Sequence, residues 1–242
     1  MDDELALYDT TRDELRLRLA GRFPADFDLE NTLTAYAYWV CTVMRNHGKA
    51  WESTVQDYVD FALRDAVQEA QAEKIEVDLL RRELTACASP LLDVGAGWGR
   101  FAALYAACGL EAVYTEPTDL GCRLLRRNGL TQARHVSTRC LGQALSFAGG
   151  AFQSAVIGWV LHHDAPDVPA AGIMGEIARV MAPAGRLLSI EPLSGDFDAS
   201  KWRDLVESAG FVVEKLENFF DLSSPGKKSE QYAYLAAVRY VE

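Results

Sequence analysis

The sequence lacks the features that mark membrane, secreted and metal-binding proteins. No apolar run reaches about 18 residues, the length that a membrane-spanning helix needs. The first residues, Met-Asp-Asp-Glu, are acidic, whereas a signal peptide begins with basic and then apolar residues. The five cysteines are odd in number and form no C-x-x-C pair. We therefore expect a cytoplasmic protein without a membrane anchor, whose cysteines are buried thiols.

Positive charge is also scarce. The chain has 24 Lys and Arg against 35 Asp and Glu, a net charge of −11. Residues 1–90 contain 18 acids and 10 bases, a net of −8, and residues 91–242 contain 17 acids and 14 bases, a net of −3. Because a field of this sign repels polyanions, we expect no nucleic-acid partner. The length of 242 residues suits one sizeable α/β domain with a helical extension.

Residues 91–100 are the most informative stretch, and they read Leu-Leu-Asp-Val-Gly-Ala-Gly-Trp-Gly-Arg. The apolar start predicts a buried strand, and Gly95, Gly97 and Gly99 predict a tight turn after it. Glycine permits positive φ angles and lets a ligand approach the backbone closely. Residues 101–108 favour a helix, whose first-turn N–H groups carry partial positive charge. This order outlines a cofactor site with Asp93 at its edge.

The part of the chain before this stretch predicts helices only. Short helices end at Gly21, an amphipathic pattern covers residues 29–47, and a longer one runs from Trp51 to about Thr85. The Ser89-Pro90 pair marks a boundary. We therefore divide the chain into an N-terminal helical cap over residues 1–88 and a second domain over residues 89–242.

The second domain alternates between strand and helix patterns. Strands are expected at residues 91–94, 111–116, 133–137, 153–161 and 186–190, and as an antiparallel pair at 211–220 and 231–240. Helices are expected at residues 118–128, 170–181 and 199–209, with a turn at 183–185. This order predicts an α/β fold with a doubly wound, mostly parallel, seven-stranded sheet and an antiparallel last strand. Such a sheet binds ligands at the carboxyl ends of its strands.

The glycine spacing separates two classes of cofactor. The dinucleotide pattern G-x-G-x-x-G needs a small third glycine where this chain has Arg100, whose long side chain fits poorly against a strand. The stretch resembles instead motif I of the class I S-adenosylmethionine-dependent methyltransferases, acid-x-Gly-x-Gly-x-Gly. The likeness extends over about residues 90–240, through Glu116, residues 146–156, residues 177–190 with Pro183 and Gly185, and residues 202–211.

This resemblance implies a set of cofactor contacts. Gly95, Gly97 and Gly99 form the turn against which the methionine part of the cofactor lies, with Asp93 ordering the turn and the cofactor's ammonium. Glu116 holds the ribose, and Trp159 lines the methionine end. The family's acid for the adenine amino group is missing from residues 140–143, and we expect Gln143 to replace it.

Three residues at predicted strand ends are candidates for the chemistry. His162 and His163 follow the fourth strand, and Glu191 ends the fifth. Either imidazole can take a proton from an acceptor hydroxyl near neutral pH; alternatively, one caps the strand and the other is solvated. Successive residues on a strand point to opposite faces, which disfavours a metal site built from His162, His163 and Asp164. We expect no metal.

The acceptor contacts are expected in the additions to the domain. Tyr38 and Trp39 in the cap, together with Glu191 and Phe220, are candidates, whereas Tyr36 fits a core position better. Aromatic rings with nearby carboxylates suit a cationic amine or a flat phenol. We therefore predict a methyltransferase (EC 2.1.1) that methylates oxygen or nitrogen of a small molecule, for instance in specialised metabolism.

Two alternatives stay open, a protein methyltransferase and a catalytically silent, cofactor-binding partner subunit. The sequence names neither the acceptor nor the oligomeric state, and a homodimer is compatible with it.

Overall fold

The computed structural model describes residues 3–130, 136–163, 169–193, 195–222 and 230–240. The chain divides into two compact units, the first ending at Lys74 and the second beginning at Ile75. This division lies within helix α3 (Trp51–Leu84), earlier than the expected boundary after residue 88. The reason is packing, because Leu79, Leu80 and Leu84 belong to a hydrophobic cluster of the second unit.

The first unit consists of α1 (Asp3–Leu19), α2 (Leu29–His47) and most of α3. The ends of α2 follow from capping, because Asp28 accepts a hydrogen bond from the backbone of Asn31 and Gly48 adopts a φ of 62° at the other end. The bounds of α2 are those that the sequence predicts. The core of this unit is made of the buried residues Tyr8, Leu15, Leu19, Leu33, Tyr36, Ala37, Val40, Val55 and Ala62.

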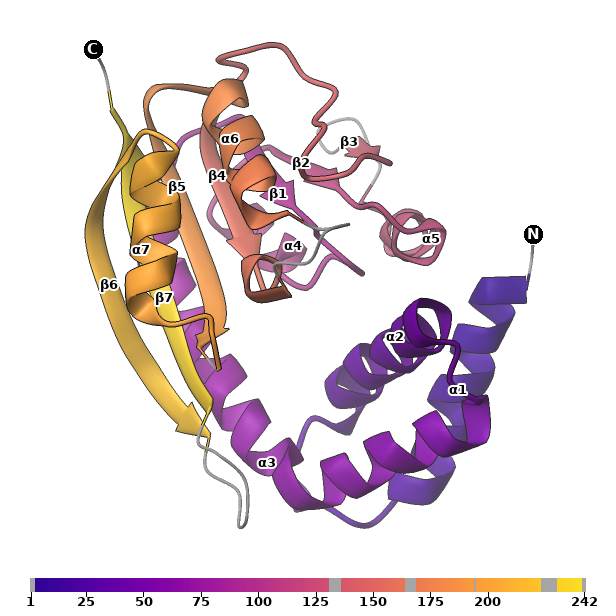
Figure 1. Ribbon diagram of the computed structural model, residues 1–242. Coiled ribbons are helices and arrows are strands. Elements are labelled where there is room, and N and C mark those ends of the chain that lie inside the picture. The colour runs from indigo at the N-terminus through magenta and orange to yellow at the C-terminus, as the bar shows by residue number, and fades with distance from the viewer. Residues whose placement is uncertain (1–2, 131–135, 164–168, 194, 223–229, 241–242) are drawn as a thin grey trace. The chain divides into compact units, whose positions relative to one another are not determined.

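The second unit is built on one mixed sheet (Figure 1). Its strands are β1 (Leu91–Val94), β2 (Ala112–Thr115), β3 (Val136–Thr138), β4 (Phe152–Gly158), β5 (Met181–Leu193), β6 (Phe211–Leu222) and β7 (Glu230–Arg239). They lie in the order β3-β2-β1-β4-β5-β7-β6. The pairs from β3 to β5 are parallel, whereas β7 is antiparallel to both β5 and β6. The α/β class, the mostly parallel sheet and the antiparallel last strand are confirmed.

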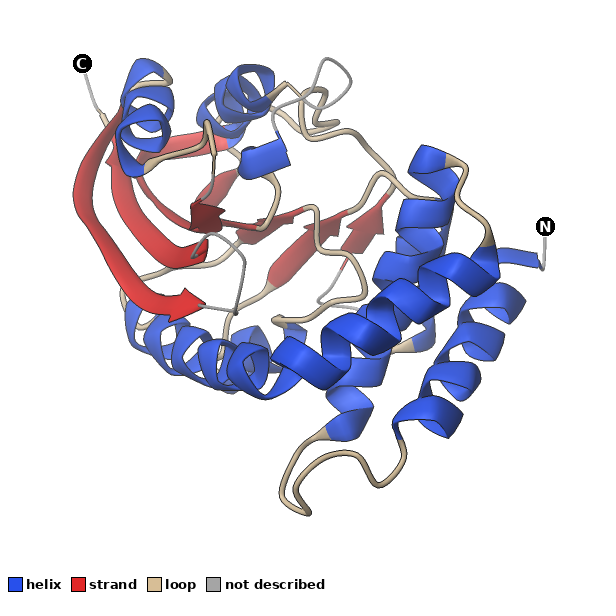
Figure 2. Ribbon diagram, turned by 60° about the horizontal axis from the view of Figure 1, so that its bottom comes forward, coloured by secondary structure: helices blue, strands red, loops and turns tan. Residues whose placement is uncertain are grey.

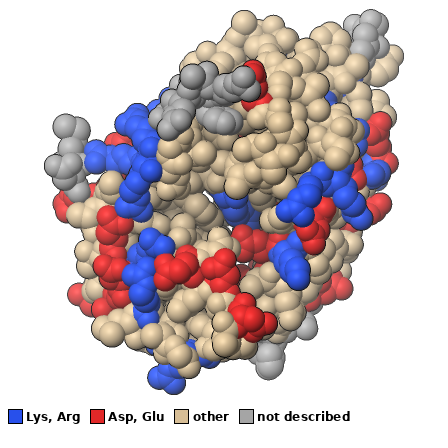
Figure 3. All heavy atoms as spheres, turned by 180° about the vertical axis from the view of Figure 1, so that it is seen from behind, with Lys and Arg blue, Asp and Glu red and all other residues tan. Residues whose placement is uncertain are grey.

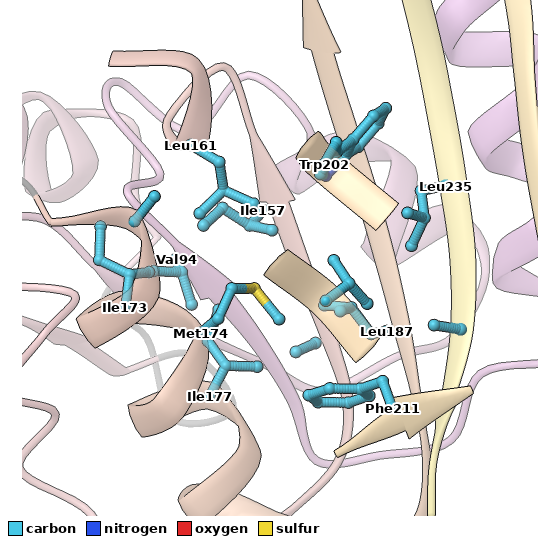
Figure 4. Packing of buried hydrophobic residues seen from close by; sticks show 14 of the residues in the cluster. Val94, Ile157, Leu161, Ile173, Met174, Ile177, Leu187, Trp202, Phe211 and Leu235 are labelled. Atoms are coloured by element: carbon cyan, nitrogen blue, oxygen red, sulfur yellow. The ribbon is translucent and has the colours of Figure 1, made fainter. Parts of the chain in front are cut away.

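Helices cover both faces of this sheet (Figure 2), as a doubly wound fold requires. On one face, α6 (Ala170–Val180) and α7 (Ala199–Ser208) pack on β1, β4, β5 and β7. Figure 4 shows Ile173, Met174 and Ile177 of α6 pointing toward the strands. On the other face lie the end of α3, α4 (Ala102–Ala107) and Leu125 of α5 (Asp119–Arg127). The carboxyl ends of β1, β2, β4 and β5 are thereby left at one edge.

Two predictions about strand bounds are wrong. The strand expected over residues 153–161 ends at Gly158, because Trp159 turns to a φ of 62° and a 3-10 turn, η1 (Leu161–His163), follows. The turn expected at residues 183–185 lies inside β5, where Ala184 has a φ of 58° and the register with β4 shifts.

Among the described residues, no helix combines the length and the apolar character that a membrane span needs.

Candidate functional site

The glycine turn follows β1 and is fixed by hydrogen bonds to the neighbouring strand. Gly95, Gly97 and Gly99 have φ angles of 73°, 57° and 88°, which explains why glycine occupies all three positions. The N–H groups of Gly95 and Ala96 donate to the carbonyl of Thr115, each at 2.9 Å. The predicted turn is therefore present, and its backbone is held in place by the end of β2.

Glu116 closes this turn from the end of β2. The residue is 2% exposed, and its Oε2 accepts a hydrogen bond from the N–H of Gly97 at 3.0 Å. Oε1 accepts from the N–H of Thr118 at 3.0 Å and from its hydroxyl at 2.5 Å. A Cβ at Gly121 would lie 2.5 Å from the Glu116 side chain, so α5 packs directly on it. The carboxylate thus joins the glycine turn to Thr118, and the ribose contact predicted for it stays a prediction.

Asp93 is buried near the end of β1. Its carboxylate accepts a hydrogen bond from the hydroxyl of Tyr105 at 3.1 Å. Burial raises the pKa of Asp93 to about 7, against the opposing effects of Tyr105 and Arg100, and the nearby charge of Glu116 adds to the rise. Near neutral pH this carboxyl group is therefore divided between its protonated and charged forms.

The side chain of Arg100 is held by a carboxylate of α3 and by two aromatic rings. Its Nη2 atom lies 2.5 Å from Oε1 of Glu76 in α3. The guanidinium also lies 4.3 Å from the ring centre of Phe101 and 5.4 Å from that of Trp159. In the sequence, Arg100 argues against a dinucleotide site, and no sequence signal links it to Glu76, 24 positions earlier.

Glu191 closes the turn after β4 in the same way. It is fully buried and its Oε1 accepts hydrogen bonds from the N–H groups of Val160 and Leu161, at 3.1 and 3.0 Å. Its Oε2 accepts from the N–H of His162 at 3.3 Å and faces Nδ1 of the same ring at 2.8 Å. Glu191 is thus enclosed by the turn after β4, and the acceptor contact predicted for it stays a prediction.

His162 and His163 lie on the 3-10 turn η1 and not on a strand. Their rings are therefore side by side, with centres 3.9 Å apart, where a strand would have placed them on opposite faces. The side chain of His162 is mostly buried, and His163 is exposed. Asp164, the third residue of the metal hypothesis, lies outside the described residues, and the described part of the chain holds no His, Cys, Asp and Glu cluster that fits a metal ion.

Trp159 joins an aromatic cluster around Tyr232. Its backbone N–H donates to the carbonyl of Ile190 at 2.8 Å, and its ring centre lies 5.2 Å from that of Tyr232. Trp159 has a φ of 62°. Such a positive φ is strained in a bulky residue, and strained backbone is concentrated at functional sites. Phe220 stacks on Tyr232 at 6.3 Å. Tyr232 thus connects Trp159 and Phe220. Tyr232 is not among the residues predicted from the sequence, although its spacing of two residues from Tyr234 in a predicted strand indicates that both rings lie on the same face of the sheet.

The other predicted contacts lie apart from this cluster in the chain. Gln143 is half-buried beside α6. A Cβ added at Gly172 of α6 would lie 3.3 Å from the Cβ of Gln143. In the helical unit, the ring of Trp39 lies 5.7 Å from Tyr36 and 6.5 Å from Tyr58. Tyr36 is buried, as predicted, and its hydroxyl donates to Glu69 at 2.6 Å. Tyr38 is half-buried on the same helix.

Charges of both signs are mixed over the face seen in Figure 3, where Lys and Arg side chains lie next to Asp and Glu. All five cysteines are free thiols. The candidate site itself consists of buried carboxylates, two histidines and aromatic rings at the carboxyl edge of the sheet.

Comparisons with known proteins relate the sheet domain to methyltransferases. A family model described as a methyltransferase domain matches residues 92–189, from β1 into β5. No curated protein matches the chain in sequence. A putative methyltransferase from Bacillus halodurans is 17% identical with a TM-score of 0.56, covering 67% of this chain and 98% of that one.

Two further solved structures show the same fold. The glycopeptide N-methyltransferase MtfA, complexed with S-adenosylmethionine, is 14% identical with a TM-score of 0.55, covering 68% of this chain and 92% of that one. The [4+2]-cyclase SpnF is 18% identical with a TM-score of 0.54, covering 68% of this chain and 81% of that one. At such low identity the likeness is one of fold.

Proposed function

We propose that the chain is an S-adenosylmethionine-dependent methyltransferase and that it methylates a hydroxyl group of a small aromatic molecule; a methyltransferase-domain model matches residues 92–189. The observation that carries this proposal is the pair of His162 and buried Glu191, 2.8 Å apart at the carboxyl ends of β4 and β5. A hydroxyl is a weak nucleophile until its proton is removed, so a fixed base is useful for that acceptor.

The residues at the glycine turn suit the chemistry of this cofactor. When bound, S-adenosylmethionine supplies an electrophilic methyl group on a sulfonium, and it also carries an ammonium and a ribose. Asp93 and Glu116 are buried carboxylates beside the turn, and carboxylates suit both cationic groups and hydroxyl donors. We assign the methionine part to Gly95, Gly97 and Trp159, with Gly99 shaping the turn, and the adenine to Gln143.

In this proposal, His162 is the catalytic base and Glu191 is its positioning residue. Because the Glu191 carboxylate only accepts hydrogen bonds, Nδ1 of His162 carries the proton and Nε2 keeps a lone pair. Nε2 then takes the proton of the acceptor hydroxyl, and Glu191 stabilises the charged ring that results. His163 contacts the first ring but has no comparable carboxylate among its described contacts.

The aromatic rings support a flat acceptor. Trp159, Tyr232 and Phe220 form one group of neighbouring rings in the sheet domain, in which Phe220 stacks on Tyr232 and Trp159 is tilted against it. Tyr38 and Trp39 are our candidate acceptor contacts from the helical unit. Rings of this kind bind flat apolar surfaces through dispersion and stacking.

The test compares His162→Gln with His163→Gln, using purified protein, S-adenosylmethionine and a panel of phenols and amines. Formation of S-adenosylhomocysteine is followed against pH. We expect His162→Gln to slow methylation of a phenol by about 10²–10⁴-fold and to remove the rise of rate with pH. His163→Gln is the matched control and should stay within a few-fold.

Equal loss in both variants, or none, would contradict the assigned base. Turnover with amines and not phenols would replace the hydroxyl by nitrogen as the acceptor. Methyl transfer only to protein in a cell extract would favour a protein methyltransferase, and cofactor binding without any turnover would favour a silent subunit.

A further inference from the structure

We propose that Arg100, presented by Glu76, binds the carboxylate of the cofactor's methionine portion. This inference rests on the cofactor and not on the identity of the acceptor. Its basis is the position of the guanidinium, its restraint on three sides and the balance of charge around the glycine turn.

The position of Arg100 follows from the strands beside it. Val94 and Ile157 are register partners, so β1 and β4 end side by side. A Cβ at Gly158, the last residue of β4, would lie 3.7 Å from Nη2 of Arg100. The guanidinium therefore lies at the carboxyl ends of the two central strands, directly beside the turn that receives the methionine part.

The guanidinium is held rigidly there. Its hydrogen bond to Glu76 is 2.5 Å long, and the side chains are only 16% and 3% exposed. The rings of Phe101 and Trp159 lie 4.3 and 5.4 Å from its central carbon. Cation–π contacts of this kind fix the plane of an arginine, and a fixed plane lowers the entropy lost when it binds a carboxylate with two parallel hydrogen bonds.

Donors remain for a ligand. A guanidinium has five N–H donors, and within the described residues that of Arg100 donates one hydrogen bond, to Glu76. Its other donor atoms are not among the fully buried polar atoms without a partner in the described structure. Within the described residues, the remaining donors of Arg100 are therefore open to an anion at the carboxyl ends of β1 and β4.

The charge balance explains why a cation is needed at this place. Asp93, Glu116 and Glu191 are buried at the same edge of the sheet. Glu116 and Glu191, together with Asp93 in its charged form, suit the ammonium and sulfonium of the cofactor and would repel its carboxylate. Arg100 offsets that repulsion, and Glu76 from α3 orients the guanidinium.

The test uses two ligands that differ only in the group in question. S-adenosylhomocysteine has the carboxylate, and S-adenosyl-3-thiopropylamine lacks it but keeps the ammonium. Binding of both is measured by calorimetry. Because removing Arg100 alone would take the ion-pair partner from the buried carboxylate of Glu76, the variant is the double substitution Arg100→Met with Glu76→Gln.

We expect the double variant to bind S-adenosylhomocysteine about 10–100-fold more weakly, the usual effect of losing charge-assisted hydrogen bonds, and to bind the thiopropylamine within about twofold. Glu76→Gln alone should weaken S-adenosylhomocysteine about threefold and leave the thiopropylamine unchanged. Arg126→Met, which removes an exposed arginine of α5, is the control and should change neither affinity.

Equal losses for both ligands would mean that Arg100 only shapes the turn, and no loss for either would place the carboxylate elsewhere. Both results overturn the inference while leaving the cofactor in place. Failure of the unaltered protein to bind either ligand would instead count against the cofactor itself.

Discussion

Two turns at the carboxyl edge of the sheet are built by the same device. The turn after β1 is tied by Glu116 at the end of β2, and the turn after β4 is tied by Glu191 near the end of β5. Each carboxylate is buried and accepts backbone N–H groups from the loop that follows the neighbouring strand. In each case a charge that would be costly to bury is satisfied by peptide donors.

The two turns differ in the further group that contacts each carboxylate. Glu116 also accepts hydrogen bonds from the N–H and the hydroxyl of Thr118, the N-cap of α5, so this carboxylate links the glycine turn to the next helix. Glu191 faces the ring of His162, so this carboxylate links backbone to a group that can change its protonation. The same arrangement therefore fixes a backbone turn on one side, where we propose that the cofactor binds, and orients a histidine on the other, which we propose as the base.

The largest expected effect is that of Glu191→Ala. The substitution leaves the N–H groups of Val160, Leu161 and His162 without their acceptor in a buried place, and each orphaned group is costly. We expect the free energy of unfolding to fall by about 5 kcal/mol, measured by urea denaturation. Glu191→Gln keeps one acceptor oxygen and should lose less stability, while still slowing turnover. A stable Glu191→Ala protein would remove Glu191 from the comparison.

Asp93, which lies on the Glu116 side, should make the free energy of unfolding depend on pH. Its pKa is raised from 3.8 to about 7, so the fold favours the protonated acid. Its contribution to stability is therefore full below about pH 4 and is lost as the pH rises to about 7. Relative to Asp93→Asn, the native protein should lose roughly 3–4 kcal/mol between pH 4 and pH 8.

Urea denaturation of both proteins across this range checks the prediction. Tyr105→Phe removes a donor to the charged form and should move the loss to higher pH, because the hydroxyl of Tyr105 holds the Asp93 pKa down. A constant difference between the native protein and Asp93→Asn would show that Asp93 titrates normally.

The sequence predicted the first turn better than the second. Gly95, Gly97 and Gly99 announce positive φ angles by their residue type, so the turn could be placed from sequence alone. Trp159 has the same left-handed backbone but no residue type that signals it, and the strand was therefore extended too far. The 3-10 turn that brings the two histidine rings together was missed for the same reason.

The roles of the carboxylates were harder to predict than their positions. Glu116 and Glu191 were correctly placed at strand ends, but a strand-end carboxylate can face a ligand or bind the next loop. That choice depends on donors distant in the chain, such as Val160 for Glu191, 31 residues away. The pairing of Arg100 with Glu76 has the same origin, because helix α3 reaches the turn only through tertiary packing.

A smaller effect is expected from Glu116→Ala, and it should appear in a different measurement. Cofactor binding should weaken by about 1.5–3 kcal/mol, because both the ribose contact and the hydrogen bond to Gly97 are lost. Calorimetry with S-adenosylhomocysteine measures this loss. By contrast, Glu191→Gln should leave cofactor affinity unchanged and lower only the rate. A Glu191 variant that loses affinity, or a Glu116 variant that keeps it, would break the division between the two sides.

The smallest effect is that of Thr118→Val, which tests the donor that only the Glu116 side possesses. The Thr118 hydroxyl accepts from the N–H of Gly121 at 3.0 Å, capping α5, and donates to Glu116. Valine has the same shape without the hydroxyl, so we expect a loss of about 1 kcal/mol in unfolding free energy from the missing cap.

Cofactor affinity should fall at the same time, by about threefold, because Glu116 loses one of the donors that fix it against Gly97. Thr118→Ser keeps the hydroxyl and is the matched control, expected to change neither quantity. If the valine variant lost stability but bound S-adenosylhomocysteine normally, the cap and the cofactor turn would be independent, and Glu116 would be held by the peptide groups alone. The difference between the two turns would then lie wholly in the ring of His162.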